Sequence, residues 1–189
     1  MDIVLNPQLK SKTAIALKKI SSKREIVEDK EYDGYLIEGD EKIVRSITEF
    51  LKSKKEKKVI AILGRDDEFN RRVIETCKID YLVSPERGHV RDTLKQRDSG
   101  LNHVVAKEAV KKNISIVIDF SSLVKFEKKF QARVLARIMQ NIKICRKAKC
   151  HIKIATFAVR KEDLRDEFSL RSFCFSLGMS SEQVRDAVQ

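Results

Sequence analysis

From Gly34 onward, short apolar segments alternate with amphipathic ones, and this alternation restricts the possible folds more than any other feature of the sequence. The predominantly apolar segments lie at 34–38, 59–63, 80–83, 114–120 and 151–156. Amphipathic helices are predicted at 40–54, 66–77, 99–112, 129–148, 169–177 and 180–188. Strands with apolar residues on successive positions are buried on both faces, which is typical of a parallel sheet covered by helices.

The first 33 residues carry weaker signals. Residues 2–5 and 24–28 are predicted to form short strands. Asn6 and Pro7 predict a helix start, because Asn is a good N-cap and Pro fits the first helical position. The buried stripe of that helix would comprise Leu9, Ala16, Leu17 and Ile20.

These elements predict about seven mostly parallel strands surrounded by helices, in a single domain over residues 1–189. An eight-unit α/β barrel usually takes ~250 residues. The length therefore fits a compact or incomplete TIM-barrel-like α/β fold, with a flat doubly wound sheet as the alternative. We expect no membrane span and no signal peptide. The irregular spacing of the cysteines favours reduced thiols in a cytoplasmic protein; they are Cys77, Cys145, Cys150 and Cys174.

Positive charge is concentrated between Lys128 and Lys161. The chain has a net charge of +12, and this segment holds 11 Lys and Arg residues without a single Asp or Glu. A dense basic surface gains affinity for phosphates by releasing their counterions, so we expect an RNA partner. The alternative is a solvated helix face without a partner. Because aromatic residues make up only 6% of the chain, recognition of the RNA backbone and shape is favoured over base stacking.

The candidate RNA-binding residues come from this basic segment and from the loop that follows the predicted strand 80–83. The long predicted helix is expected to pack its apolar side on the sheet and to project its basic residues outward. The loop lies at the carboxyl end of a strand, where ligands gather in parallel α/β folds. The alternative is that Glu86 pairs with Arg87 or Arg91 and makes the loop purely structural. The complete set is Arg87, His89, Arg91, Lys95, Arg97, Arg133, Arg137, Lys143, Arg146, Lys147, Arg160 and Lys161.

No pattern of catalytic residues, cofactor-binding residues or metal ligands is found. The three histidines, at 89, 103 and 151, lack His-x-His or His-x-x-x-His spacing, and His103 is interpreted as structural. Asp2, Glu38, Asp119 and His89 could lie near strand ends, but a dinuclear hydrolase would need more ligands. Gly64 stands alone after its strand, so no phosphate-binding loop is predicted.

Several segments together resemble the RNase P protein component 3 family, a subunit of RNase P shared by archaea and eukaryotes. They are residues 80–88 (DYLVSPERG), 101–107 (LNHVVAK), 118–121 (IDFS), 133–141 (RVLARIMQN), 145–147 (CRK) and 177–179 (LGM). Residues 1–79 match in outline, and the chain is short for the family.

The resemblance implies a TIM-barrel-like fold related to a metal-dependent phosphoesterase superfamily. It also implies a ribonucleoprotein endonuclease that removes 5′ leaders from precursor tRNA, with the RNA as catalyst. The implied partners are RNase P RNA, the small component 2 subunit, other RNase P proteins and, through the complex, precursor tRNA. The superfamily's N-terminal metal-binding histidines are missing, because Asp2 is followed by Ile-Val-Leu-Asn. We therefore expect no catalytic site, metal or cofactor in this chain.

Two other functions remain as alternatives at this point. One is a stand-alone metal-dependent phosphoesterase on the same barrel, which would require bound metal and turnover by the pure protein. The other is a protein-interaction scaffold whose charge serves an acidic protein partner.

Overall fold

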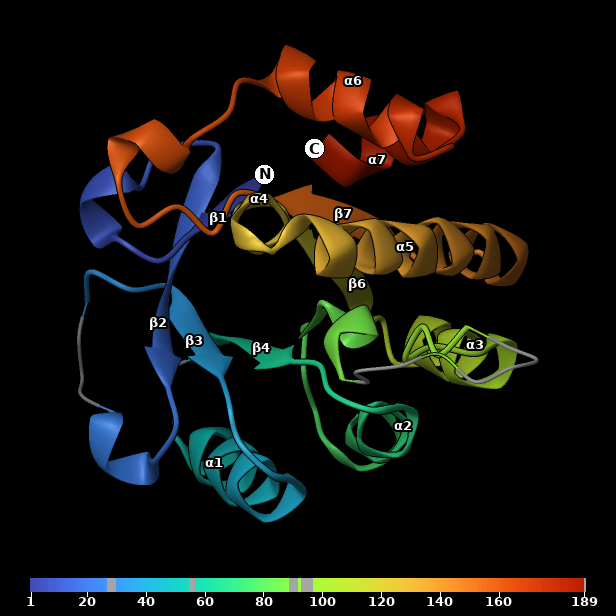
Figure 1. The fold of residues 1–189 in the computed structure, drawn as a ribbon. Coiled ribbons are helices and arrows are strands. Elements are labelled where there is room, and N and C mark those ends of the chain that lie inside the picture. Colours follow the sequence, from blue (N-terminus) through green and yellow to red (C-terminus); the bar gives the residue numbers. More distant parts are fainter. Residues whose placement is uncertain (27–29, 55–56, 89–91, 93–96, 189) are drawn as a thin grey trace.

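The computed structural model of this chain describes residues 1–26, 30–54, 57–88, 92 and 97–188. Within these residues, seven parallel strands form one sheet in sequence order, from β1 to β7 (Figure 1). The strands are β1 Asp2–Val4, β2 Ala14–Ile20, β3 Gly34–Ile37, β4 Val59–Leu63, β5 Tyr81–Val83, β6 Ser115–Asp119 and β7 Ile152–Ala155. The sequence-order pairing of parallel strands is that of an α/β barrel.

Hydrogen bonds join the two edge strands of this sheet. The Phe157 amide donates to the Ile3 carbonyl at 2.7 Å, and Val4 forms a parallel bridge with Ala158. The Thr156 hydroxyl donates to the Asp2 carboxylate at 2.6 Å, which adds a side-chain bond to the closure. The sheet therefore curls into a barrel. The TIM-barrel-like prediction is confirmed, and the flat doubly wound alternative is wrong.

Helices surround the barrel, and most of them begin at a side-chain cap, although α5 does not. They are α1 Glu41–Ser53, α2 Asp67–Thr76, α3 His103–Lys111, α4 Phe120–Lys125, α5 Lys128–Ala148, α6 Glu167–Ser176 and α7 Ser181–Val188. Side chains of Asp or Asn accept a backbone N–H at the first turn of α1, α2, α3, α4 and α6. α4 was not predicted, because residues 114–120 were interpreted as one strand. In the structure β6 ends at Asp119, and α4 begins at the next residue, Phe120.

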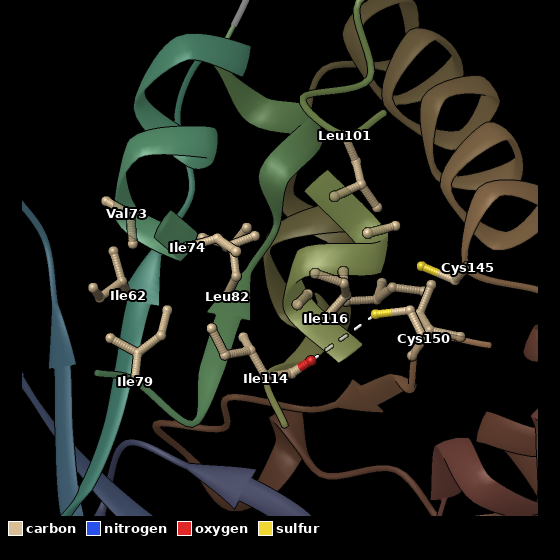
Figure 2. Close-up of a cluster of buried hydrophobic side chains, with 14 of the residues drawn as sticks. Ile62, Val73, Ile74, Ile79, Leu82, Leu101, Ile114, Ile116, Cys145 and Cys150 are labelled. Atoms are coloured by element: carbon tan, nitrogen blue, oxygen red, sulfur yellow. Dashed lines mark hydrogen bonds between the residues drawn. The ribbon is translucent and has the colours of Figure 1, made fainter. Parts of the chain in front are cut away.

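The core has two layers, and together they explain why the strands are apolar throughout. Side chains such as Leu36, Val83 and Val117 fill the barrel interior, where the cluster contains no helix residue. Alternate strand residues pack outward against the helices. Figure 2 shows part of this outer layer, with Ile62 and Leu82 near Ile74 of α2. All four cysteines are buried and free.

The N-terminal predictions are wrong in two places. Residues predicted as a helix form β2 (Ala14–Ile20), and only Pro7–Leu9 takes a 3₁₀ turn, capped by the Asn6 side chain. The apolar residues of this segment fit either element, and pairing with β1 and β3 makes it a strand. The predicted strand at 24–28 begins instead with a 3₁₀ turn at Lys23–Glu25, and residues 27 and 28 lie outside the described part.

A buried asparagine connects the loops at the carboxyl ends of β4 and β5. The Asn70 amide nitrogen donates to the carbonyls of Arg65, Pro85 and Gly100 at 2.9–3.1 Å, and its oxygen accepts the Arg65 N–H at 2.8 Å. Gly100 has a φ of +69°, and a Cβ there would lie 1.8 Å from the Pro85 carbonyl oxygen. Asn70 and Gly100 therefore allow these loops to pack closely.

We expect Asn70→Ala to lower the free energy of unfolding by about 2 kcal/mol, because it leaves buried backbone groups without partners. Chemical denaturation monitored by circular dichroism measures this effect. Asn102→Ala, which removes only a helix cap, should cost about 1 kcal/mol and serves as the comparison. Equal losses for the two variants would contradict the connecting role of Asn70.

Candidate nucleic-acid interface

The loop after β5 lies at the barrel mouth and contains the first candidate residue, Arg87. Its guanidinium lies over the Phe126 ring, 5.4 Å from the centroid, and donates to the Ser122 hydroxyl at 3.5 Å. Arg87 also lines a cleft of about 490 Å³ together with Arg65, Asp66 and Glu38, at the carboxyl ends of β3, β4 and β5. Part of the Arg87 side chain is thus already engaged within the protein.

The neighbouring Glu86, in the same loop, is buried. Burial raises the pKa of its carboxyl to about 7, although its own backbone N–H and the Arg87 charge oppose the shift. Burial also raises the pKa of the nearby Asp119, against hydrogen bonds from Ser122. The burial of Glu86 favours a structural role for this residue, on which Arg87 acts only through its charge, because the Arg87 guanidinium contacts Ser122 and Phe126. Arg91, the other predicted partner, lies outside the described residues.

Glu86 should make stability depend on pH in a defined direction. The pKa of Glu86 is about 7 in the folded protein and near the usual 4.5 in the unfolded chain. Between these two pH values, the folded protein keeps a proton that the unfolded chain has released. The contribution of Glu86 to the free energy of unfolding is therefore fully present below about pH 4.5 and is lost as the pH rises toward about 7. Relative to Glu86→Gln, the wild type should lose roughly 2–3 kcal/mol over this range. Urea denaturation at several pH values tests this, and parallel curves for the two proteins would contradict it.

Arg137 does not project outward as predicted. Its guanidinium is fully buried. The Nε–H donates to the Asp92 carboxylate at 2.7 Å, and the Nη1–H donates to the backbone carbonyl of Glu86 at 3.0 Å. Partial burial opposes ionisation of Asp92, but hydrogen bonds from the Asp98 N–H and from Arg137 lower its pKa. Arg137 therefore holds the barrel-mouth loop against α5 and has no exposed surface for RNA.

The position of Arg137 in the sequence of α5 is consistent with its burial, because it is spaced like the buried apolar residues of this helix. The buried residues of α5 are Val134, Arg137, Ile138, Asn141, Ile142 and Cys145. Arg137 and Asn141 thus lie on the same stripe as the apolar residues, three or four positions from each neighbour. Asn141 donates to the Ser99 carbonyl at 2.9 Å, so both polar members of the stripe bind the segment that precedes α3.

Lys143 and Lys147 of α5 are exposed, as predicted, and lie one turn apart. Together with Gln140, Ile144 and His103 of α3 they line a hollow of about 420 Å³, here called the α3–α5 groove. Gln140 donates to the Arg97 carbonyl at 3.4 Å, which places the exposed Arg97 beside the groove. Within the described residues, neither lysine has an ion-pair partner.

The other candidates are dispersed. Arg146 donates to the Gln183 side chain at 2.8 Å and to the Gly178 carbonyl, so it connects α5 to the turn between α6 and α7. Arg133 is half-buried near Asp92, while Arg160 and Lys161 are exposed after β7. His89, Arg91 and Lys95 lie outside the described residues. Among the candidates that the structure describes, only Lys143 and Lys147 line one hollow together, and the backbone of Arg97 lies beside it.

Sequence reasoning missed two polar residues of the α3–α5 groove, as well as the apolar Ile144. His103 was interpreted as structural, yet its side chain is exposed and lines the hollow with Gln140. His103 is the first residue of α3, and Gln140 lies 37 positions later on α5. Their meeting depends on the packing of α3 against α5, for which the sequence carries no local signal.

The described part of the chain contains no group of three His, Cys, Asp or Glu side chains placed to hold a metal ion. Among its helices, none is both long and apolar enough to cross a membrane.

The fold and the groove thus define a TIM-barrel-like protein with an exposed basic groove on its helical layer. Residues 36–189 match the RNase P subunit p30 family. Because this match covers most of the chain, the protein belongs to that family.

Relatives in archaea support this assignment. Ribonuclease P protein component 3 of Methanocaldococcus jannaschii is 29% identical over 119 residues, which are 63% of this chain and 48% of the relative. The corresponding protein of Methanothermobacter thermautotrophicus is 26% identical over 144 residues, covering 76% of this chain and 55% of the relative. The chain therefore spans about half the length of the curated relatives that it matches.

A solved structure supports the fold over nearly the whole chain. A chain in the structure of archaeal Ribonuclease P with mature tRNA aligns with a TM-score of 0.72 at 20% identity. The alignment covers 98% of this chain and 85% of that one. The barrel described above is thus an architecture found within a solved RNase P particle.

Proposed function

We propose that this chain is a protein subunit of ribonuclease P that binds RNA and supports the removal of 5′ leaders from precursor tRNA. The observation that carries the proposal is the family match over residues 36–189. The proposed direct partners are RNase P RNA and the small component 2 subunit, within a cytoplasmic complex that also contains other RNase P proteins. Precursor tRNA would reach the chain through this complex, and catalysis would come from the RNA.

The α3–α5 groove is the part of the described surface best suited to an RNA backbone. Lys143 and Lys147 present two ammonium groups from successive turns, and neither is neutralised by a described carboxylate. His103 adds a further donor at the same hollow, and the exposed Arg97 follows nearby, since its backbone carbonyl accepts from Gln140. Side chains of this kind bind phosphates without reading sequence, so binding should weaken steeply with added salt. Arg160 and Lys161 would extend the contact only if the RNA also reaches the residues after β7.

The experiment that tests this function is an affinity purification of the tagged chain from its native cell. The co-purifying RNA is sequenced, and bound metal is measured in the same sample. We expect strong enrichment of RNase P RNA without stoichiometric metal. Absence of specific RNA, together with one or two tightly held metal ions per chain, would instead support the stand-alone phosphoesterase.

A further inference from the structure

Helix α6 has an outer face that the rest of the described chain leaves uncovered. Phe168 and Phe175 on this face are 78% and 52% exposed, the two highest values for aromatic residues in the described structure. They lie seven positions apart, or about 10 Å along the helix. Ser172 lies between them on the same side of the helix and is also exposed. Leu170 and Cys174, on the opposite side, are buried in the core.

This aromatic face is held rigidly against the barrel. Phe173 packs edge-to-face on Phe120 of α4, with ring centroids 5.2 Å apart. Arg146 of α5 bonds to the turn that follows α6, as described above. The two exposed phenylalanines therefore project from a fixed helix rather than from a loose terminus. Large exposed aromatic side chains on a rigid helix are typical anchors for a protein partner.

The charge around α6 is opposite in sign to that of the preceding segment. Residues 162–189 contain six acidic and three basic residues and no lysine, directly after the acid-free stretch that ends at Lys161. Glu162, Asp166 and Glu167 are exposed at the start of α6. Arg171 pairs with Glu167 at 2.9 Å, while Asp166 caps the helix through the Ser169 N–H. Residues 162–175 thus contain four acidic residues against Arg165 and Arg171, and their net charge of −2 disfavours a phosphate backbone beside the phenylalanines.

We infer that the α6 face, made of Phe168, Ser172 and Phe175, is the docking site for a protein whose contacting segment combines apolar side chains with Lys or Arg. An amphipathic helix would place apolar residues against the two rings and over the small Ser172 side chain, and its basic residues near Glu162 and Asp166. The inference rests on the proposed function in one respect, namely that the partner belongs to the same ribonucleoprotein. RNA and this protein would then occupy different faces, because α6 and α3 lie on opposite sides of α5 in Figure 1.

The first test locates the contact directly in the complete complex. The tagged chain is produced in its native cell with Ser172→benzoylphenylalanine, the complex is purified and irradiated, and the crosslinked segment is sequenced by mass spectrometry. We expect a crosslink to a protein segment that contains apolar residues flanked by Lys or Arg. A crosslink to RNA, a crosslink to a second copy of this chain, or no crosslink would each overturn the inference.

The second test measures what the two phenylalanines contribute. Phe168→Ser/Phe175→Ser should lower recovery of the crosslinked protein about tenfold or more, because loss of central aromatic anchors is costly. The matched control is Ile43→Ser/Phe50→Ser, which removes apolar side chains at the same seven-residue spacing on α1, where each is 38% exposed. Unchanged recovery for the α6 variant, or an equal loss for both, would overturn the inference.

Direct RNA binding separates this inference from the proposed function. The purified α6 variant should bind RNase P RNA with the affinity of the wild type, since the basic groove is unchanged. A parallel loss of RNA affinity would overturn the protein-docking assignment. Enrichment of RNase P RNA with the wild-type chain tests the proposed function independently of the result at α6.

Discussion

Replacing Arg137 with methionine is expected to lower the free energy of unfolding by about 3–5 kcal/mol, a large share of the stability of a domain this size. The side chain is fully buried, and its guanidinium binds both the Asp92 carboxylate and the Glu86 carbonyl. Methionine fills a similar volume but offers no donor, so the carbonyl would be left unpaired and the carboxylate would lose its cation. Chemical denaturation of the purified chain measures the loss.

The control for this prediction is Lys143→Met, which also replaces a positively charged side chain of α5 with methionine. Lys143 is exposed, so its replacement should change stability by no more than about 0.5 kcal/mol. Similar small effects for both variants would show that Arg137 is not essential to the packing of the barrel-mouth loop on α5. Reduced RNA binding by a fully stable Arg137→Met variant would restore the outward, RNA-binding role that the sequence predicted.

The second large effect is expected at the α3–α5 groove. Lys143→Glu/Lys147→Glu should weaken binding of RNase P RNA about 100-fold at low salt, because two phosphate contacts become repulsive. The slope of log affinity against log salt should become shallower by roughly two, one for each lost contact. Filter binding or fluorescence anisotropy over a range of salt concentrations gives both quantities. Because both side chains are exposed, stability should be almost unchanged.

Lys42→Glu/Lys52→Glu provides the matched control on α1. It changes the net charge by the same amount at two exposed positions away from the groove. A general electrostatic effect would lower the affinity equally for both double variants, whereas a local interface would leave the α1 variant with a much smaller loss. Equal losses would therefore contradict the assignment of RNA binding to the groove, while retaining a role for net charge.

The strands from β3 onward could be predicted because both layers of the barrel core require apolar residues. Residues 59–63, predicted as a buried strand, form β4 at Val59–Leu63. The starts of α1 and α2 could also be predicted from the sequence, because Asp40 and Asp66 are good N-caps that come directly before amphipathic segments. β2 could not be assigned in this way. Its apolar residues suit a helix or a strand, and only hydrogen bonding to β1 and β3 distinguishes the two.

The candidate site was predicted less completely. The basic character of α5 is visible in the sequence, and Lys143 and Lys147 are exposed as expected. The burial of Arg137 depends on Asp92 and Glu86, which lie 45 and 51 positions earlier. A guanidinium on a buried stripe is stable only where such partners exist, and their position is a property of the folded chain.

The sequence by itself determined the class of fold, the strands from β3 onward, the basic segment and the resemblance to the RNase P family. The fold class, the strands and the basic segment follow from spacing, capping and composition, which depend on residues close together along the chain. The resemblance follows from the short motifs between residues 80 and 179. The tertiary structure decided the closure of β1 against the residues after β7, the burial of Arg137, the assembly of the α3–α5 groove and the exposure of the α6 face. Each of these depends on which distant segments pack together, because packing decides whether a side chain meets a partner, a hollow or solvent.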